Sequence, residues 1–399
     1  MKSLLVENIH PRAAGTLGNG GMTVTSSAGS LSEDELIAAL DGVSVLGIRS
    51  RTHVSRRMLE NAPDLIAIGA YCIGTNQIDL EAASLHGVAV FNAPYSNTRS
   101  VAELVIAEIV FLIRHLYDKI VKAHQGAWDK SSENAREVRG KRLGIIGYGN
   151  IGSQVSALAE AMGMDVSYYD VADKLTIGNA TRVASLEELL KIAHVVTIHV
   201  DGNPANKNLI DEREFALMND GVFLLNLSRG HVVNIDALAE NLRRGKVAGA
   251  ALDVFPNEPT DADAPLLTPL RGLPNVLLTP HIGGSTEEAQ ESIADFVSHK
   301  LLEYLHTGST FASVNFPKIA LPKAAGTQSH RLLHVHQNVP GVLSQINGIF
   351  AKNNVNVLSQ YLRTNEVIGY AIADVDREYT HSLYEDLRRV ANTIKVRIL

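Results

Sequence analysis

The sequence predicts an α/β protein with two doubly wound parallel-sheet domains, followed by a small C-terminal domain of βαββαβ order. Short apolar stretches alternate with helical segments through most of the chain, as in parallel sheets that helices cover on both faces. The pattern changes at residue 330, after which two strands follow each other directly. The length of 399 residues also exceeds one compact core, because domains commonly hold about 100 to 200 residues.

The first segment predicts a small parallel sheet of its own. Its helical stretches at 56–61 and 80–86 fall between apolar stretches. The predicted strands are 2–6, 43–48, 65–69 and 88–92.

A long helix is predicted next. Ser100 and Glu103 have the spacing of a capping box, in which the serine side chain accepts from the first turn and the glutamate reaches back. We expect the helix to begin there and to end near Gly126.

A glycine fingerprint follows the apolar stretch 143–146. Gly147 permits a tight turn, Gly149 lets backbone N–H groups approach a pyrophosphate, and Gly152 lets a helix pack on the strand. Asp170 lies about 20 residues on, at the end of a second strand, where a carboxylate holds both hydroxyls of an adenosine ribose. The sequence therefore predicts a Rossmann-like domain that binds NAD in preference to NADP.

Composition excludes several other classes of protein. A formal net charge of -7 disfavours a nucleic-acid partner, and one cysteine, Cys72, excludes an internal disulfide and CxxC metal clusters. No stretch approaches the roughly 20 apolar residues that span a bilayer. We expect a cytoplasmic protein without a metal, a membrane or a nucleic-acid partner.

The alternation continues to the end of the second domain. Strands are predicted at 195–200, 221–226, 248–254 and 276–279. The helical stretch 286–306 then comes after the sheet is complete, so it is expected to return to the first domain. Proline, alanine and glycine at 317–329 predict a linker with a hinge.

The last segment, residues 330–399, has a different order of strands and helices from the two preceding domains. Helices are predicted at 341–353 and 382–391, and this βαββαβ order is ferredoxin-like. The segment carries no cluster of catalytic character, which favours a regulatory or assembly role. Its predicted strands are 332–336, 355–362, 367–375 and 394–399.

Three residues of the second domain have the chemistry of hydride transfer. Arg229 follows an apolar strand, at the edge where α/β enzymes bind ligands, and its planar group suits a carboxylate. His281 also follows a strand and can exchange a proton near neutral pH. Glu258 lies between two prolines, and a carboxylate bonded to a histidine raises the pKa of that histidine and fixes its tautomer.

Together these motifs resemble the D-isomer-specific 2-hydroxyacid dehydrogenases, and among them the members that act on 3-phosphoglycerate and end in an ACT domain. The resemblance covers nearly the whole chain, through the segments 47–52, 72–77, 91–103, 143–152, 226–230, 253–259 and 279–285. It implies a substrate-binding domain of residues 1–97 and 285–317, an NAD-binding domain of 98–284, a linker of 318–329 and an ACT domain of 330–399.

The implied activity is NAD-dependent oxidation of 3-phospho-D-glycerate to 3-phosphohydroxypyruvate, the first step of L-serine biosynthesis. His281 would be the acid and base, Glu258 would orient it and Arg229 would bind the substrate. L-serine would inhibit at the ACT domain of a homotetramer.

The resemblance also implies the binding residues. The cofactor set comprises Gly147, Gly149, Asn150, Ile151, Gly152, Asp170, Leu227, Ser228, Arg229, Asp253, His281, Ile282, Gly283 and Gly284. The substrate set comprises Arg49, Arg51, Gly74 and Asn76, with Lys130 supplied by a neighbouring subunit. The effector set comprises His336, Asn338 and Asn356.

Two other functions remain open at this point. A glyoxylate or hydroxypyruvate reductase shares the catalytic set, although the ACT domain and Arg49 argue against it. A non-catalytic sensor of NAD or serine is disfavoured because all three catalytic residues are present. The stretch 324–330 departs from the family pattern, because it is longer and lacks paired glycines.

Overall fold

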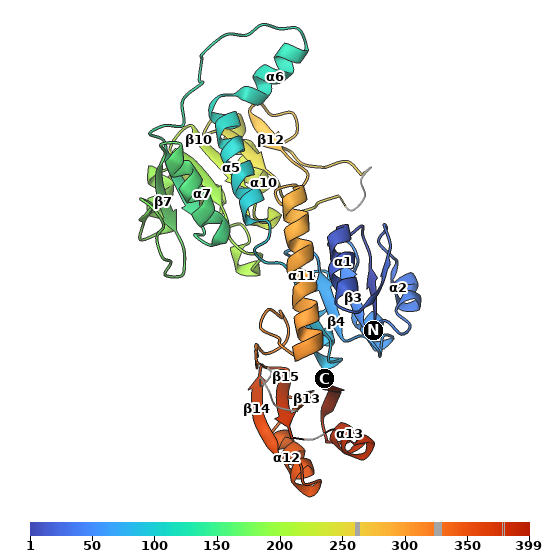
Figure 1. The fold of residues 1–399 in the computed structure, drawn as a ribbon. Helices are drawn as coiled ribbons and strands as arrows, with labels where there is room; N and C mark the ends of the chain where they lie inside the picture. The colour runs from blue at the N-terminus through green and yellow to red at the C-terminus, as the bar shows by residue number, and fades with distance from the viewer. Residues whose placement is uncertain (260–263, 323–328, 377, 379) are drawn as a thin grey trace. The chain divides into compact units, whose positions relative to one another are not determined.

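The computed structural model describes residues 1–259, 264–322, 329–376, 378 and 380–399 (Figure 1). The chain divides into two compact units, and residues Met1–Ser96 and Gln290–Leu399 form the first. Residues Asn97–Ala289 form the second unit. Two sheets are parallel and one is antiparallel, and this confirms the predicted fold class.

The first unit contains a five-stranded parallel sheet of order β2-β1-β3-β4-β5. The strands are β1 (Lys2–Leu5), β2 (Thr23–Ser26), β3 (Val45–Ile48), β4 (Ala67–Ala70) and β5 (Ala89–Phe91). The helices between them are α1 (Pro11–Asn19), α2 (Glu33–Ala39), α3 (Arg56–Glu60) and α4 (Leu80–Leu85). The sequence analysis missed β2 because this edge strand is mostly exposed and therefore lacks an apolar run.

Helices cover both faces of this sheet. One face packs against apolar residues of α2, α3 and α4. The other face packs against α1 and against α11 (Glu287–Thr307), which returns from far along the sequence. Gly69 on β4 makes the close approach of α11 possible, since a Cβ there would lie 2.8 Å from Val297 and Leu301. The unit is thus assembled from two separate stretches of sequence.

The second unit contains a seven-stranded parallel sheet of order β12-β11-β10-β9-β6-β7-β8. Its strands are β6 (Arg142–Ile146), β7 (Asp165–Tyr169), β8 (Thr181–Arg182), β9 (Val195–Ile198), β10 (Val222–Asn226), β11 (Val247–Leu252) and β12 (Val276–Leu278). Its helices are α5 (Thr98–Ile113), α6 (Leu116–His124), α7 (Asn150–Ala161), α8 (Leu186–Ile192), α9 (Glu212–Leu217) and α10 (Ile235–Arg243), with short 3-10 turns η1 (Pro204–Asn206) and η2 (Gly230–Val232). Apolar residues of α5 and α7 cover one face, and those of α8, α9 and α10 cover the other.

The predicted capping box is wrong. Helix α5 begins at Thr98, with Asn97 as its N-cap, so Ser100 already lies inside the first turn. Its hydroxyl contacts that of Thr286 at 2.8 Å, and Glu103 instead pairs with Arg99. The helix also ends earlier than predicted, because His115 has a φ of 50° and interrupts the helical path before α6 begins.

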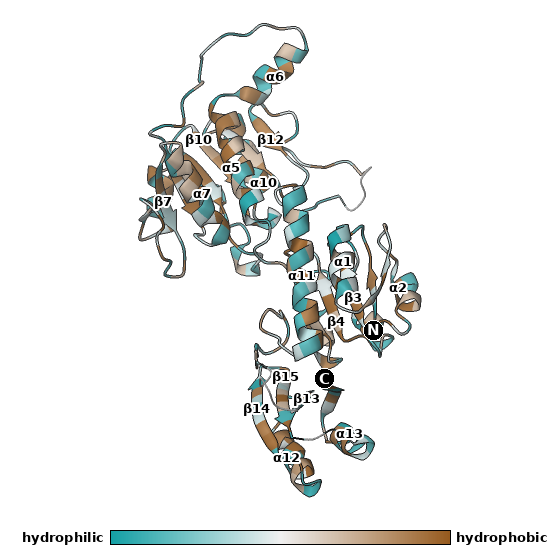
Figure 2. Cartoon of the chain, viewed as in Figure 1, coloured by the Kyte–Doolittle hydropathy of each residue, from teal (hydrophilic) through white to brown (hydrophobic). Residues whose placement is uncertain are grey.

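Helix α5 is a core helix of the second unit. Figure 2 shows it as mostly hydrophobic, and half of its sixteen residues are buried, among them the carboxylic acid of Glu108. Across the described ranges, the search for a helix both long and apolar enough to cross a bilayer finds none.

The C-terminal sheet is antiparallel, with order β14-β15-β13-β16. Its strands are β13 (His330–Gln337), β14 (Val357–Thr364), β15 (Ile368–Val375) and β16 (Thr393–Ile398), and its helices are α12 (Val342–Lys352) and α13 (His381–Arg388). The chain order is therefore βαββαβ. Half of the predicted linker 318–329, residues 323–328, lies outside the described residues, and so does most of the 324–330 stretch with the expected hinge.

Both faces of the inner strands β13 and β15 of the C-terminal sheet are buried. Successive residues of a strand point to opposite faces, so Leu332 joins the core beneath α12 and α13, whereas Leu333 packs with Tyr304 and Phe316 of the first unit's main core. The hydroxyl of Tyr370 on β15 donates to the carbonyl of Gly308 at 2.7 Å. The sheet therefore forms part of the first unit.

A buried ion pair lies in this contact. Arg331 and Asp374 are each 1% exposed, and the guanidinium donates to both carboxylate oxygens at 2.7 Å. It also donates to the carbonyls of Thr307, Leu321 and Pro322, at 2.8, 2.7 and 3.1 Å. Because every hydrogen-bonding group of the guanidinium is directed at an acceptor, the charge is well compensated.

We expect Asp374→Ala to lower the unfolding free energy of the C-terminal sheet by about 3–5 kcal/mol, because it leaves the Arg331 charge buried without its partner. Urea unfolding of the full chain, followed by circular dichroism, measures the change. The double substitution Arg331→Met with Asp374→Leu removes both charges and should recover most of the loss. Equal unfolding midpoints for the parent and Asp374→Ala would show that the pair has no such role.

Candidate active site

The glycine loop after β6 has the geometry of a pyrophosphate cradle. Gly147 has a φ of 91°, and a Cβ there would lie 2.5 Å from the carbonyl oxygen of His199. A Cβ at Gly152 would lie 2.2 Å from the carbonyl oxygen of Gly147. Gly149 has no atom within 4 Å of such a position, so the loop is open at its second glycine. Each glycine thus meets a different steric requirement of a dinucleotide loop.

Helix α7 begins at this loop without a side-chain cap. Its N-cap is Gly149, so the first N–H groups from Asn150 and Ile151 onward are not covered by a capping side chain. A helix N-terminus with exposed N–H groups favours anions. The loop and helix together fit the pyrophosphate of a dinucleotide.

Asp170 lies directly after β7 and faces the glycine loop. One carboxylate oxygen accepts from the backbone N–H of Tyr148 at 2.8 Å, and the other accepts from that of Ala172 at the same distance. These bonds hold the carboxylate beside the loop. Its place fits a carboxylate that accepts from the two ribose hydroxyls of NAD.

The loop that carries Arg229 is folded by Asn226 at the end of β10. This fully buried amide accepts from the hydroxyl of Ser228 at 2.7 Å and donates to the carbonyl of Arg229 at 3.0 Å. Gly230 then passes close to the next loop, since a Cβ there would lie 2.0 Å from the carbonyl carbon of Phe255. The close packing of these two loops brings Arg229 and Glu258 to the same side of the sheet.

His281 and Glu258 form a hydrogen-bonded pair. Nδ1 of His281 lies 2.8 Å from Oε2 of Glu258, and Oε1 of Glu258 accepts from the backbone N–H of Phe255 at 3.1 Å. The backbone of His281 has a φ of 54°, and its side chain is half-exposed. With Nδ1 bonded to the carboxylate, Nε2 is the nitrogen that can exchange a proton with a ligand.

The pair perturbs both pKa values. The hydrogen bond to Glu258, opposed by partial burial, raises the pKa of His281 above its usual value, and the charges of Glu258 and Asp253 add to the increase. Burial acts to raise the pKa of Glu258, but the hydrogen bond and charge of His281 outweigh it and lower that pKa. Arg229 lowers the pKa of both groups. The carboxylate therefore stays ionised while the imidazole titrates.

Asp253 holds the turn on which His281 lies. Its carboxylate accepts from the hydroxyl of Thr279 at 2.7 Å and from the backbone N–H groups of Ile282 and Gly283 at 2.8 Å each. It is 2% exposed. The sequence analysis assigned Asp253 to the cofactor set, but its three bonds show that it also fixes the position of the imidazole.

The remaining cofactor-set residues lie in these same loops. Leu227 and Ser228 are buried behind Arg229, and Gly284 follows the turn held by Asp253. The structure therefore collects Arg229, Glu258 and His281 at the carboxyl ends of β10, β11 and β12. These assignments remain predictions of role.

The residues of the predicted substrate set, other than Lys130, lie in two loops of the first unit, at the carboxyl ends of its strands. Arg49 and Arg51 follow β3, while Gly74 and Asn76 follow β4. Within the described part of the chain, neither guanidinium has a carboxylate within salt-bridge distance. Their charges are therefore available to an anion.

Glu7 shapes this loop, and the sequence analysis missed it. Its carboxylate accepts from the backbone N–H groups of Arg49, Arg51 and Thr52 at 3.0, 2.9 and 2.8 Å. It is 8% exposed and has a φ of 64°. An acidic residue directly after β1 was the available signal, because the neighbouring parallel strand β3 ends at the same edge of the sheet.

Lys130 lies outside these clusters. It is exposed on the segment after α6, where its ammonium lies 5.9 Å from the ring centre of Trp128. The indole is 83% exposed. Within the second unit the structure does not bring Lys130 to the His281 turn by any contact.

The three effector-set residues are not brought together within one chain. His336 lies on β13 opposite Gly369, whereas Asn356 precedes β14, whose first residue pairs with Val375 at the other end of β15. His336 is 3% exposed, and its Nε2 is buried without a hydrogen-bond partner among the described residues. Gly369 leaves room for this ring, because a Cβ there would lie 2.1 Å from it. Asn338 is exposed and donates to the carbonyl of Asn365 at 2.7 Å.

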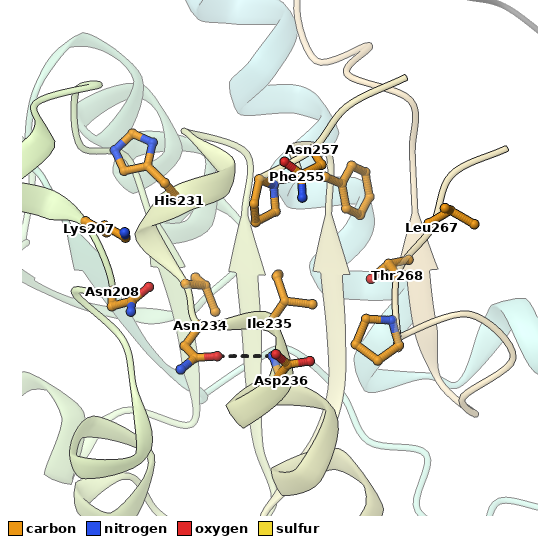
Figure 3. A pocket seen from close by; sticks show the side chains of 13 residues that line it. Lys207, Asn208, His231, Asn234, Ile235, Asp236, Phe255, Asn257, Leu267 and Thr268 are labelled. Carbon is orange, nitrogen blue, oxygen red and sulfur yellow. Dashed lines mark hydrogen bonds between the residues drawn. The ribbon is translucent and has the colours of Figure 1, made fainter. Parts of the chain in front are cut away.

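A pocket of about 360 Å³ lies beside the candidate site in the second unit (Figure 3). Its walls come from the loops around His231, Phe255 and Thr268 and from the start of α10, where Asn234 caps Asp236. None of the three catalytic candidates lines it. The proposed chemistry therefore belongs to the loop surface that carries His281, not to this pocket.

Family profiles match two parts of the chain. The profile of the D-isomer specific 2-hydroxyacid dehydrogenase NAD binding domain matches residues 106–283. The profile of the AHAS small subunit-like ACT domain matches residues 332–395. The first match contains the glycine loop and all three catalytic candidates, and the second covers most of the C-terminal sheet.

Full-length relatives are similar throughout. D-3-phosphoglycerate dehydrogenase of Haemophilus influenzae is 49% identical over 100% of this chain and 97% of its own length. The enzymes of the same name from Escherichia coli K12 and Dictyostelium discoideum are 46% and 48% identical, again over 100% of this chain and 97% of theirs.

Solved structures share the fold. D-lactate dehydrogenase from Aquifex aeolicus, complexed with NAD and lactic acid, has a TM-score of 0.67 and 27% identity, and the match covers 79% of this chain and 100% of that one. A glyoxylate reductase from Paecilomyes thermophila has a TM-score of 0.69 and 26% identity, over 79% of this chain and 98% of that one.

We expect Glu258→Gln to lower the pKa of His281, because the substitution removes the negative charge that stabilises the imidazolium. Titration of the histidine ring signals by NMR measures this pKa, with the His281→Ala spectrum as the assignment. Glu240→Gln, which removes an exposed carboxylate of α10, is the control and should leave the signal unmoved. An unchanged pKa in Glu258→Gln would rule out the pair as its cause.

Proposed function

The chain belongs to the D-3-phosphoglycerate dehydrogenases, within the D-isomer specific 2-hydroxyacid dehydrogenase family, and on that basis we propose that it oxidises 3-phospho-D-glycerate to 3-phosphohydroxypyruvate with NAD. The observation that carries the proposal is the grouping of Arg229, Glu258 and His281 on one edge of the NAD-binding sheet. This oxidation begins the synthesis of L-serine.

The cofactor fits the residues present. The open loop at Gly149 and the uncapped start of α7 suit the pyrophosphate, and Asp170 suits the ribose. The turn at Ile282 and Gly283 and the carboxylate of Asp253 would bound the nicotinamide end. When bound, NAD supplies the hydride acceptor.

The three catalytic residues supply proton transfer and substrate binding. Neutral His281 accepts the proton of the C2 hydroxyl at Nε2, and ionised Glu258 stabilises the imidazolium through Nδ1. Arg229 holds the carboxylate and the C2 oxygen, and its positive charge favours the developing carbonyl. Arg229 also opposes excessive basicity of the imidazole, since it lowers the pKa that Glu258 raises.

The phosphate of the substrate requires cations, and the first unit offers them. Arg49 and Arg51 have no competing carboxylate within the described residues, and Glu7 fixes the backbone that carries them. Gly74 and Asn76 belong to the neighbouring loop. We assign Lys130 to the same phosphate in a second copy of the chain, because it is exposed and, among the described residues, its ammonium lies over the Trp128 ring and not beside the candidate site.

We further propose that L-serine is a feedback inhibitor bound between two C-terminal domains. His336 and Asn356 lie at opposite ends of one sheet, so a small amino acid that contacts both must lie between two copies. The unpartnered Nε2 of His336 offers a buried polar contact. Exposed Tyr117, Ile120 and Trp128 on and after α6 support further self-association, and the assembly that we propose is a homotetramer.

The alternatives are a glyoxylate or hydroxypyruvate reductase and a non-catalytic NAD or serine sensor. Spectrophotometric measurement of NADH formation from 3-phosphoglycerate, with and without L-serine, distinguishes them. Turnover that L-serine reduces supports the proposed enzyme, and the absence of turnover in both directions favours a sensor.

We also propose that the protein is cytoplasmic. The single cysteine and the biosynthetic reaction suit that compartment.

We expect His281→Ala to lower turnover by about 10²- to 10⁴-fold, because the proton of the C2 hydroxyl loses its acceptor. NADH affinity, measured by its fluorescence, should remain nearly that of the parent, since the glycine loop and Asp170 are untouched. Turnover equal to that of the parent would exclude His281 as the base.

We expect Arg49→Ala to lose preference for phosphorylated substrate. The ratio of kcat/KM for 3-phosphoglycerate to that for glycerate should fall by roughly 10- to 100-fold, the cost of one charged hydrogen bond of about 1.5–3 kcal/mol. Arg57→Ala is the matched control, since that guanidinium already pairs with Glu33. A parent that discriminates, together with an Arg49→Ala variant that discriminates equally, would remove Arg49 from the phosphate site.

A further inference from the structure

Helix α5 carries a carboxylic acid in the core of the NAD-binding unit. Glu108 is 4% exposed, and both of its carboxylate oxygens are buried without a hydrogen-bond partner among the described residues. The residues that precede and follow it on the same face, Val105 and Leu112, belong to the apolar core between α5 and the sheet. An ionised carboxylate in such surroundings is strongly disfavoured.

Asp253 is the charge that acts on this acid. It lies at the end of β11, one of the strands against which α5 packs. Its two oxygens already accept three hydrogen bonds, from Thr279, Ile282 and Gly283. Burial and then the negative charge of Asp253 raise the pKa of Glu108 to about 8. Glu108 is therefore neutral at pH 7.

We propose that Glu108 is a positioning residue for the catalytic turn: while it is protonated, Asp253 remains the sole anion beneath residues 281–283, and when it ionises the turn loses its support. The inference rests on the proposed function through the role of His281, and it names a residue that touches neither substrate nor cofactor.

The physical link runs through the hydrogen bonds of Asp253. Ionisation of Glu108 places a second negative charge in the same apolar layer, and the two carboxylates then repel each other. This repulsion displaces the carboxylate of Asp253 from the position in which it accepts all three bonds from the turn. The N–H groups of Ile282 and Gly283 lose their acceptor, and the position of His281 is no longer fixed.

Other titratable groups on the elements that pack against α5 have partners elsewhere. Asp118 on α6 accepts from the backbone N–H of Asn275, and Glu160 on α7 accepts from that of Asn179. On β12 and the turn after it, His281 pairs with Glu258. The only ionisable side chain on β10 and β11 or directly after them that acts on Glu108 is Asp253.

The test compares pH profiles of the parent and Glu108→Gln, whose amide mimics the protonated acid and cannot ionise. Between pH 7 and pH 9.5, kcat/KM for 3-phosphoglycerate should fall in the parent as Glu108 loses its proton. The ratio of kcat/KM at pH 9.5 to that at pH 7 should be roughly 10-fold higher in Glu108→Gln, because a group with a pKa of about 8 is almost fully ionised at pH 9.5. Equal ratios in the two proteins would overturn the proposal.

Two further variants guard against a merely structural effect. Glu103→Gln removes an exposed carboxylate of the same helix, which pairs with Arg99, and should keep the pH profile of the parent. Glu108→Met is a second neutral side chain of similar length, and it should share the profile of Glu108→Gln even if its absolute rate differs. A profile for Glu108→Met that matches the parent would also count against the titration of Glu108.

Binding of NADH separates this inference from the proposed function. The turn held by Asp253 is also a cofactor contact, so the Kd of NADH, read from its fluorescence, should rise above pH 8 in the parent and stay level in Glu108→Gln. This result would support the role of Glu108 even if 3-phosphoglycerate were not the substrate. The same alkaline rise in both proteins would overturn it, whichever substrate the enzyme uses.

Discussion

The carboxylate of Asp253 is the interaction on which the candidate site depends most. It lies where β11 ends and accepts three hydrogen bonds from the residues that follow β12, so it joins two neighbouring strands beyond the edge of the sheet. His281 occupies a left-handed backbone conformation in that turn, which an ordinary residue adopts only when its surroundings fix it. Asn226 performs a similar role one strand away. Buried polar side chains thus hold the loops that carry the reactive groups, where regular secondary structure ends.

The sequence predicted those parts of the molecule that depend on local pattern. The buried strands, the three glycines and the residues after β10, β11 and β12 could be located because apolar runs end abruptly in polar residues. The edge strand β2 and the break at His115 were missed for the opposite reason, since β2 has no apolar run and no glycine marks the break at His115. The capping box failed because the N-cap is Asn97, three residues before the expected serine, and this leaves Ser100 inside the first turn.

Long-range contacts were beyond the reach of sequence patterns. The position of Glu7 after β1 places it at the edge of the sheet, but only the structure shows that its carboxylate binds the backbone of a loop more than forty residues away. Similarly, both faces of β13 carry apolar residues, Leu332 on one face and Leu333 and Val335 on the other, and this pattern does not indicate what each face contacts. Only the three-dimensional arrangement shows that both faces of β13 and β15 are buried, and that Arg331 and Asp374 are shielded from water. The roles of these residues follow from their partners, not from their types.

The return of α11 to the first sheet has a consequence for biosynthesis of the chain. The second unit is contiguous, from Asn97 to Ala289, and all of its strands are synthesised before α11. The first unit cannot close one face of its sheet until that helix arrives, because Val297 and Leu301 cover Gly69. The second unit can therefore fold during synthesis while the N-terminal strands still have an exposed apolar surface. During that interval the first sheet exposes the apolar face that α11 covers in the folded protein.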